Sequence, residues 1–351
     1  MNIKIFTFYC TNNYGALLQG LCLKEFLKDN FNLKIEFARY IPKKLFFREI
    51  YRPLIRKNPF IFYQFLKKNY CLSKWKKKMN LQSPKFTKEI NNPSISVYGS
   101  DSIWAVSYLG FYPYYFGEKN DGYKITYAAS MGPTDITKLD DYQKKKIKIL
   151  LNSYDFISVR DYNTANIVKE MTGSDPLIVV DPVFLSTPRF FNYSFNNAKK
   201  KLKKYVIIYG AIFSNKDKKK ILNYCKKENL QSISIGYINN WVDKNYVSAT
   251  PEDFVGYLSQ ANSVFTSMFH GVMLSVKLRK QFWYSIDPIR ANKLSYFIDH
   301  LDLSSRLLSN SENLNANFDY ALIENKLFDW IKLSKEYLTN SINKKVVLER
   351  Y

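Results

Sequence analysis

His270 is the residue of this chain best suited to move a proton near neutral pH, because imidazole titrates close to that range. The chain has 351 residues and only two histidines, and the other, His300, lies in an ordinary amphipathic stretch. Residues 264–266 predict a strand and residues 272–278 a helix. The turn between them, with His270-Gly271, would lie in the crevice where parallel α/β sheets bind ligands. The alternative is a histidine that only caps or packs the turn.

Asp101 and Arg160 occupy comparable positions. Asp101 follows a short apolar run, 95–98, and its carboxylate could take a hydroxyl proton. A turn with a helix cap explains it equally well. Arg160 lies near the end of a predicted strand, 155–161, and its planar guanidinium suits a carboxylate or phosphate. A structural ion pair with Asp155 or Asp161 is the alternative.

The elements that must position these residues alternate between strand and helix. In the first half the patterns predict strands at 3–8, 33–38, 95–98, 124–128, 155–161 and 177–180, and helices at 16–27, at 140–151 and from Asp161. The second half predicts strands at 205–209, 231–235, 264–266 and 281–284, and helices at 216–227, 251–259, 272–278 and 317–340. This alternation predicts an α/β protein with two parallel-sheet domains facing a cleft: residues 1–186, a linker at 187–204, and residues 205–351.

Positive charge is concentrated in one segment, residues 41–89, here called the basic lobe. The whole chain carries +23, and the basic lobe holds 14 Lys and Arg against 2 Glu, with ten aromatic residues interleaved. A helical insertion that contacts anionic lipid would fit this pattern. A solvated lysine-rich insertion fits it too, and so does a nucleic-acid surface. Nucleic acid ranks last because no known binding motif accompanies the charge.

Several classes of protein are disfavoured by what the sequence lacks. No apolar run approaches the roughly 18 residues of a membrane span, and the N-terminus turns polar too early for a signal peptide. A cytoplasmic protein is therefore expected. Four separated cysteines form no CxxC pair, so no metal site is expected. The first strand and helix lack GxGxxG, so NAD is not inferred.

Six segments, in order along the chain, resemble the motifs of one family. They are Asn13-Tyr14-Gly15-Ala16-Leu17-Leu18-Gln19, Gly99-Ser100-Asp101-Ser102-Ile103-Trp104, Tyr127-Ala128-Ala129-Ser130-Met131-Gly132, Ser158-Val159-Arg160-Asp161, Asp181-Pro182-Val183 and Ser267-Met268-Phe269-His270-Gly271. Together they resemble the polysaccharide pyruvyl transferase family. Two features depart from it: Met268 stands where some members have arginine, and the basic lobe matches no motif.

The resemblance implies a GT-B-like pair of Rossmann-type domains and a transferase of exopolysaccharide or capsule biosynthesis. Its donor would be phosphoenolpyruvate, and its acceptor a sugar of a cell-surface glycan or of a lipid-linked precursor. The product would be a pyruvate ketal, formed without metal or cofactor. Peripheral contact of the basic lobe with the inner face of the plasma membrane would bring the enzyme to such an acceptor.

Roles for individual residues follow from this chemistry. The residues expected in catalysis are His270 and Asp101, and those expected to bind the donor are Arg160, Ser267, Gly271, Lys293 and Arg290. The residues expected at the acceptor are Asn13, Tyr14, Ser100 and Trp104, although Trp104 suits core packing equally well. Two other functions remain open: a GT-B glycosyltransferase using a nucleotide sugar, and a non-catalytic scaffold of glycan assembly.

Overall fold

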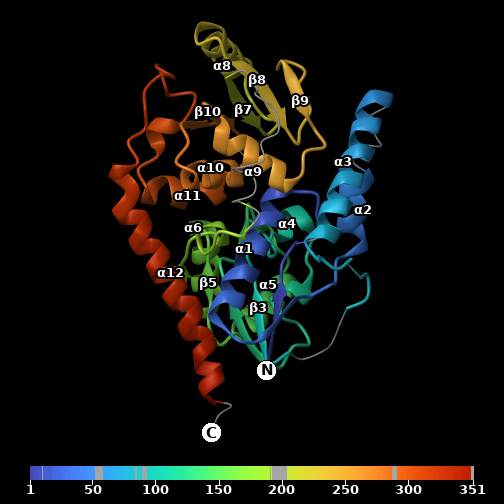
Figure 1. Ribbon diagram of the computed structural model, residues 1–351. Helices are drawn as coiled ribbons and strands as arrows, with labels where there is room; N and C mark the ends of the chain where they lie inside the picture. Colours follow the sequence, from blue (N-terminus) through green and yellow to red (C-terminus); the bar gives the residue numbers. More distant parts are fainter. Residues whose placement is uncertain are drawn as a thin grey trace.

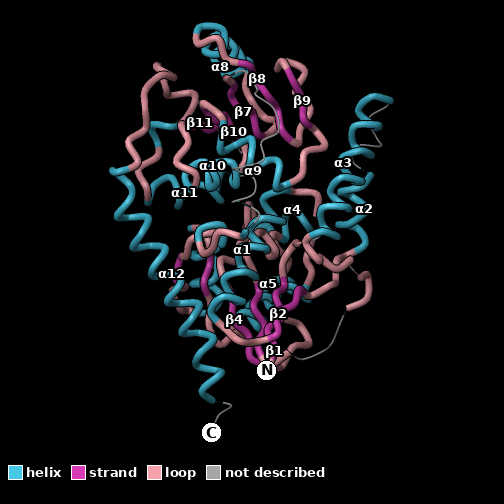
Figure 2. Tube along the Cα trace, viewed as in Figure 1, coloured by secondary structure: helices cyan, strands magenta, loops and turns pink. Residues whose placement is uncertain are grey.

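The computed structural model describes residues 1–9, 11–51, 58–83, 85–88, 93–189, 191, 204–286 and 291–348. Two lobes, each built around a parallel sheet, stack one above the other, and helices cover their faces (Figures 1 and 2). The two-domain α/β prediction is therefore confirmed.

The N-terminal domain contains a four-stranded sheet in the order β2-β1-β3-β4, and all of its pairs are parallel. The strands are β1 (Asn2–Phe6), β2 (Lys34–Phe37), β3 (Ile95–Tyr98) and β4 (Tyr123–Thr126). Two short strands, β5 (Ser158–Val159) and β6 (Leu177–Ile178), extend it through single bridges. Its larger helices are α1 (Tyr14–Asn30), α5 (Asp141–Leu151) and α6 (Tyr162–Thr172), beside the short α4 (Val106–Leu109).

The C-terminal domain contains a five-stranded parallel sheet in the order β11-β10-β7-β8-β9. The strands are β7 (Tyr205–Tyr209), β8 (Gln231–Ile235), β9 (Lys244–Tyr246), β10 (Ser263–Thr266) and β11 (Phe282–Tyr284). The helices are α8 (Asn215–Lys227), α9 (Pro251–Gln260), α10 (Phe269–Lys277) and α11 (Ala291–His300). Thr250 caps α9 in a reciprocal capping box with Asp253, and Pro251 occupies the first turn, as the sequence predicts.

Each sheet has a point where the strand order reverses. The loops that follow the strands at these two points carry candidate site residues. The chain leaves β1 toward β2 and then crosses to β3 on the other side, so the reversal lies between β1 and β3. In the second sheet it lies between β7 and β10. Ligands of open α/β sheets bind beyond the carboxyl ends of strands at such reversals. Asp101 follows β3, and His270 follows β10.

The last helix, α12 (Ala321–Leu348), joins the two domains instead of ending within the second one. Its beginning packs on α11 through Trp330, whose ring lies 4.6 Å from that of His300. The indole of Trp330 also donates to Ile178 O at 3.0 Å, and Tyr123 donates to Ser341 O at 2.7 Å. Figure 1 shows the helix running down the side of both lobes. The helix therefore stabilises the relative position of the domains.

The basic lobe forms two helices, α2 (Lys43–Tyr51) and α3 (Pro59–Lys78), as the sequence predicts. Asn58 caps α3, and Leu72 and Trp75 anchor one face of the helix in the core. Two lysines connect α3 to the other domain: Lys68 Nζ donates to Gly236 O at 2.8 Å, and Lys78 Nζ lies 2.8 Å from Glu252. These contacts attach α3 to both domains, so the helix is not a detached insertion.

Candidate active site

A group of charged side chains from both domains meets at the facing sheet edges. Arg160 Nη1 lies 2.7 Å from Asp181 Oδ2, and its Nη2 lies 3.8 Å from Asp101 Oδ1. His270 Nε2, from the opposite domain, lies 3.4 Å from the same oxygen of Asp181. We call these four residues, together with Lys293, the interdomain charge cluster. The structure thus brings His270, Asp101 and Arg160 together, as the sequence predicts, and adds Asp181.

The backbone explains why these side chains converge. Asp101 and Arg160 each follow a strand of the N-terminal sheet, and Asp181 comes three residues after β6. Asp101 has a φ of 75°, and its carboxylate accepts from the amide of Ser102 at 2.7 Å. Asp161 caps α6 by accepting from Thr164 N at 2.9 Å, which leaves the preceding arginine free to face Asp181. Arg160 is therefore a buried ion-pair residue, as one alternative held, but its partners are Asp181 and Asp101 and not Asp155 or Asp161.

His270 lies in the first turn of α10 and is packed against the first turn of α1. A Cβ added to Gly15 would stand 2.1 Å from His270 Nδ1. Only glycine permits this approach, because a methyl group there would overlap the ring. Asn13 caps α1 by accepting from Gly15 N at 2.9 Å, which fixes the start of the helix. The imidazole is thus held between helix α1 and Asp181, and 7% of the residue is exposed.

The electrostatics favour ionised carboxylates in this cluster. Burial alone raises the pKa of Asp181, but the nearby charges of His270 and Arg160 outweigh it and hold the pKa at about 2. Burial also opposes ionisation of Asp101, whereas Lys293, Arg160 and His270 lower its pKa below the usual value. Both carboxylates are therefore negative at neutral pH. Lys293 reaches this region from α11, and its Cε lies 3.1 Å from the Cβ position of Gly132.

The N-terminus of α10 adds backbone donors next to these cations. No side chain caps the helix at Met268, and the guanidinium carbon of Arg160 stacks 4.4 Å from the ring centroid of Phe269 in its first turn. Free amides at a helix start attract anions through their hydrogens and the helix dipole. An uncapped helix, an arginine, a lysine and a histidine make this region suited to a small multiply charged anion.

Two other residues expected at the donor contribute mainly to local structure. The amide of Gly271 bonds to Met268 O at 2.9 Å, so it is not available to an anion. An added Cβ at Gly271 would stand 2.0 Å from Thr266 Oγ1, which shows that glycine permits α10 to pack on β10. Ser267 is buried, and its hydroxyl accepts from Ile212 N at 3.4 Å. The amide of Gly271 is therefore used within the helix, and its role at the donor stays a prediction. Arg290 lies outside the described residues.

The four residues expected at the acceptor each make contacts that support the local fold. Tyr14 is buried, and its hydroxyl donates to Ala249 O across the domain interface. Trp104 is fully buried, stacks on Phe116 and donates to Tyr115 O at 2.8 Å, so core packing is the correct alternative. Ser100 is buried in a network with Gln19 and Thr7, whose hydroxyl donates to Ser100 O at 2.9 Å. Asn13 is the cap of α1.

Sequence reasoning missed Asp181 as a site residue, although Asp181-Pro182-Val183 carries part of the family resemblance. The signal was its position directly after the predicted strand 177–180, the same position that singled out Asp101. Its side chain is fully buried between Arg160 and His270, which could not be read from the sequence. Among the described residues, no group of three or more His, Cys, Asp or Glu side chains is placed to hold a metal ion.

Two Rossmann-type domains face each other with the candidate site between them, which is the arrangement of the GT-B fold. The polysaccharide pyruvyl transferase model matches residues 13–287, more than three quarters of the chain. The chain therefore belongs to the polysaccharide pyruvyl transferase family. Membership makes it a transferase of polysaccharide biosynthesis. A search of curated proteins found no match to the sequence.

Solved structures resemble the chain in fold at low sequence identity. The MnaA–UDP structure of S. aureus has a TM-score of 0.51 at 10% identity, and the match covers 99% of this chain and 98% of that one. The UDP-GlcNAc 2-epimerase of Neisseria meningitidis bound to UDP-GlcNAc gives 0.46 at 11% identity, covering 98% and 100%. The wall teichoic acid polymerase TagF gives 0.47 at 11%, covering 99% and 90%. At this identity the likeness concerns the fold alone.

Proposed function

We propose that the protein transfers the pyruvate group of phosphoenolpyruvate to a sugar of a cell-surface glycan or its lipid-linked precursor, forming a ketal. The observation that carries this proposal is the interdomain charge cluster beside the uncapped start of α10. Phosphoenolpyruvate is a small anion with a carboxylate and a phosphate. Lys293 and the first amides of α10, those of Phe269 and His270, are the best candidates to bind it, with the buried Arg160 adding positive charge behind them. No metal or cofactor enters this proposal.

The reaction needs two proton movements that the cluster could supply. His270 donates a proton to the methylene carbon of the donor, which leaves an oxocarbenium-like centre at the carbon bearing the phosphate. One sugar hydroxyl adds to that carbon and a second displaces the phosphate, and both hydroxyl protons are released. One of these protons balances the new methyl group, and the other leaves with inorganic phosphate. Asp181, paired with the imidazole, stabilises its charged form.

Asp101 has a different task because its surroundings differ. Its side chain is 15% exposed, whereas that of Asp181 is completely covered. An ionised, partly exposed carboxylate can accept a hydrogen bond from the attacking hydroxyl and take its proton briefly. We therefore assign Asp101 to the acceptor and Asp181 to positioning His270 and Arg160.

A thermal-shift comparison tests the choice of donor. Phosphoenolpyruvate and a panel of nucleotide sugars would be added separately to the purified protein. A ligand that binds only the folded state raises its stability by about 2.7 kcal/mol at 100 times the dissociation constant. We expect a shift with phosphoenolpyruvate. A shift only with a nucleotide sugar would instead favour a GT-B glycosyltransferase, and no shift with either class would favour a non-catalytic scaffold.

The basic lobe supports a second proposal, peripheral contact with the anionic inner face of the plasma membrane. The outer face of α3 exposes Phe60, Tyr63, Leu66 and Tyr70, the first two by 63% and 60%. Lys67 and Lys74 are exposed along the same helix. In the described parts of the chain, no helix is both long and apolar enough to cross a membrane. Aromatic side chains flanked by lysines are typical of helices that lie on a lipid surface.

Sedimentation with vesicles tests this contact. Each lysine near an anionic surface contributes about 1 kcal/mol, and the attraction fades beyond a Debye length of roughly 8 Å at physiological salt. Binding to anionic vesicles should therefore exceed binding to neutral ones and weaken with salt. Binding that ignores lipid charge, or none, would identify a solvated insertion, and tighter binding to nucleic acid would favour the reading ranked last.

A further inference from the structure

A pocket of about 820 Å³ opens between the loop after β1 and the helix α3. Ligand sites of small molecules have volumes of about 300–1,000 Å³, so this pocket could hold a saccharide of one or a few units. The thirteen described residues that line it include no Asp or Glu, and their charged members are Lys76 and Lys77. Tyr9 and Phe46 add aromatic rings to a wall otherwise rich in amides and hydroxyls. None of the sequence-predicted site residues lines it.

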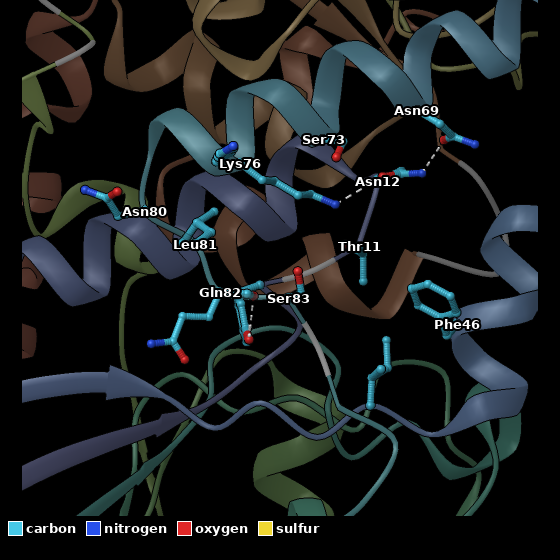
Figure 3. Close-up of a pocket in the computed structure, with 13 residues that line it drawn as sticks. Thr11, Asn12, Phe46, Asn69, Ser73, Lys76, Asn80, Leu81, Gln82 and Ser83 are labelled. Atoms are coloured by element: carbon cyan, nitrogen blue, oxygen red, sulfur yellow. Dashed lines mark hydrogen bonds between the residues drawn. The ribbon is translucent and has the colours of Figure 1, made fainter.

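The pocket is held in shape by hydrogen bonds between α3 and the loop. Asn12 Nδ2 donates to Asn69 Oδ1 at 2.6 Å, and Asn12 Oδ1 accepts from Lys76 Nζ at 3.2 Å. Figure 3 shows Asn12 lying between these two side chains of α3. On the floor of the pocket, Tyr9 donates to Gln82 O at 3.2 Å. The wall is therefore preformed, and the amide of Asn12 is already oriented.

The same loop connects the pocket to the interdomain charge cluster. Asn12 is followed by Asn13, the cap of α1, and Gly15 lies against His270 two residues later. Thr7, at the start of the loop, donates to the backbone of Ser100 beside Asp101. Both regions thus lie at the carboxyl edge of the N-terminal sheet, where its strand order reverses. A glycan seated in the pocket would therefore lie against the loop that also supports the cluster.

The charge of α3 indicates what kind of glycan fits. The helix contains six lysines and no acidic residue: Lys67, Lys68, Lys74, Lys76, Lys77 and Lys78. Lys68 and Lys78 contact the C-terminal domain, whereas Lys76 and Lys77 line the pocket. We infer that this pocket is the acceptor subsite and that it binds a saccharide bearing a carboxylate or a phosphate. The identification as acceptor subsite rests on the proposed function; the binding itself does not.

Ligand-observed NMR titration of the full chain tests the inference with three probes. Methyl glucuronide carries a carboxylate, glucose 1-phosphate carries a phosphate, and methyl glucoside is neutral. We expect one or both anionic sugars to bind and the neutral one to bind at least fivefold more weakly. Ser73→Trp, which fills the pocket from an exposed position on α3, should abolish the binding.

Two matched charge-reversal variants distinguish binding in the pocket from the general electrostatic attraction of α3. Lys77 lines the pocket and Lys67 does not, and both are exposed on α3. Lys77→Glu should weaken anionic sugars about fivefold or more, and Lys67→Glu less than twofold. Equal weakening by both, retained binding in Ser73→Trp, or equal affinity for the neutral sugar would each overturn the inference.

Phosphoenolpyruvate binding by the same variants shows which claim fails. All three variants should keep the thermal shift that phosphoenolpyruvate gives the wild type. A wild type that binds the anionic sugars through Lys77 but not phosphoenolpyruvate would refute the proposed function and leave the pocket as a saccharide site. A wild type that binds phosphoenolpyruvate but none of the anionic sugars would refute the pocket and leave the donor site.

Discussion

The interdomain charge cluster and the pocket beside α3 share one sheet edge but are built in opposite ways. In the cluster, Arg160 and Asp181 are almost completely buried, and each charge is matched by another at short distance. The pocket is open, the described residues that line it include two lysines and no carboxylate, and its other polar side chains are amides and hydroxyls. Buried, matched charges fix the geometry that a reaction needs, whereas an open wall can vary without disturbing the core. We infer that chemistry and acceptor choice are divided between the two regions.

The largest expected effect separates the regions by reaction rate. His270→Asn should lower turnover by about 10²–10⁴, because it removes the group that donates the proton. The melting temperature of the variant should stay close to that of the wild type. Ser73→Trp, in the pocket, should raise the acceptor concentration needed and leave the donor requirement unchanged. Wild-type turnover in His270→Asn would remove the histidine from the mechanism.

A stability measurement tests how strongly the opposite charges of the cluster stabilise one another. Arg160→Ala leaves the carboxylate of Asp181 buried without its arginine partner, and losing one partner of a buried ion pair typically costs about 3–5 kcal/mol. Removing the charge of Asp181 as well should recover part of this loss. Chemical denaturation of Arg160→Ala, Asp181→Asn and the double variant gives the coupling energy. Additive losses would show that the two side chains act independently.

The pH dependence of unfolding tests the same ion pairing through the ionisation of Asp181. Its pKa is about 2 in the folded protein and 3.8 is its ordinary value, so the folded state favours the charged form. This contribution is present above pH 4 and is lost as the pH falls through 2. Between pH 5 and 2 the wild type should lose about 2 kcal/mol more unfolding free energy than Asp181→Asn. Parallel curves for the two proteins would contradict the low pKa.

The packing of Gly15 on His270 offers a smaller and more local test. Gly15→Ala must displace the imidazole, because the new methyl would stand 2.1 Å from Nδ1, and overpacking typically costs about 1–3 kcal/mol. Turnover should fall at least tenfold. Gly20→Ala on the same helix is the control, since its methyl would meet Thr7 at an ordinary 3.5 Å. Equal rates in both variants would mean that this contact does not position the histidine.

The strands and caps were predictable because they depend on local patterns. Thr250 followed by Pro251 predicts the start of helix α9, and the alternation of strands and helices predicts both sheets. Strand β9 was not predicted because it is three residues long, polar and at a sheet edge. The starting point of α10 was placed three residues late, since Phe269 and His270 give no cap signal.

The positions of the site residues were predictable only where a residue follows a strand of the sheet. His270, Asp101 and Arg160 follow strands, and the structure brings them together. Tyr14 and Trp104 have side chains that suit both a sugar and a core, and only tertiary contacts decide between these roles. The pocket arises from α3 and a loop distant in sequence, so no local motif announces it.

Direct detection of the product tests the central claim. Phosphoenolpyruvate labelled with ¹³C at the phosphate-bearing carbon would be incubated with the protein and a glycan extract, and followed by ¹³C NMR together with phosphate release. We predict that the labelled carbon moves to a glycan-bound ketal, with one phosphate released per ketal, and that His270→Asn gives neither signal. Bound but unconsumed phosphoenolpyruvate, or sugar transfer from a nucleotide sugar by the same protein, would contradict the account.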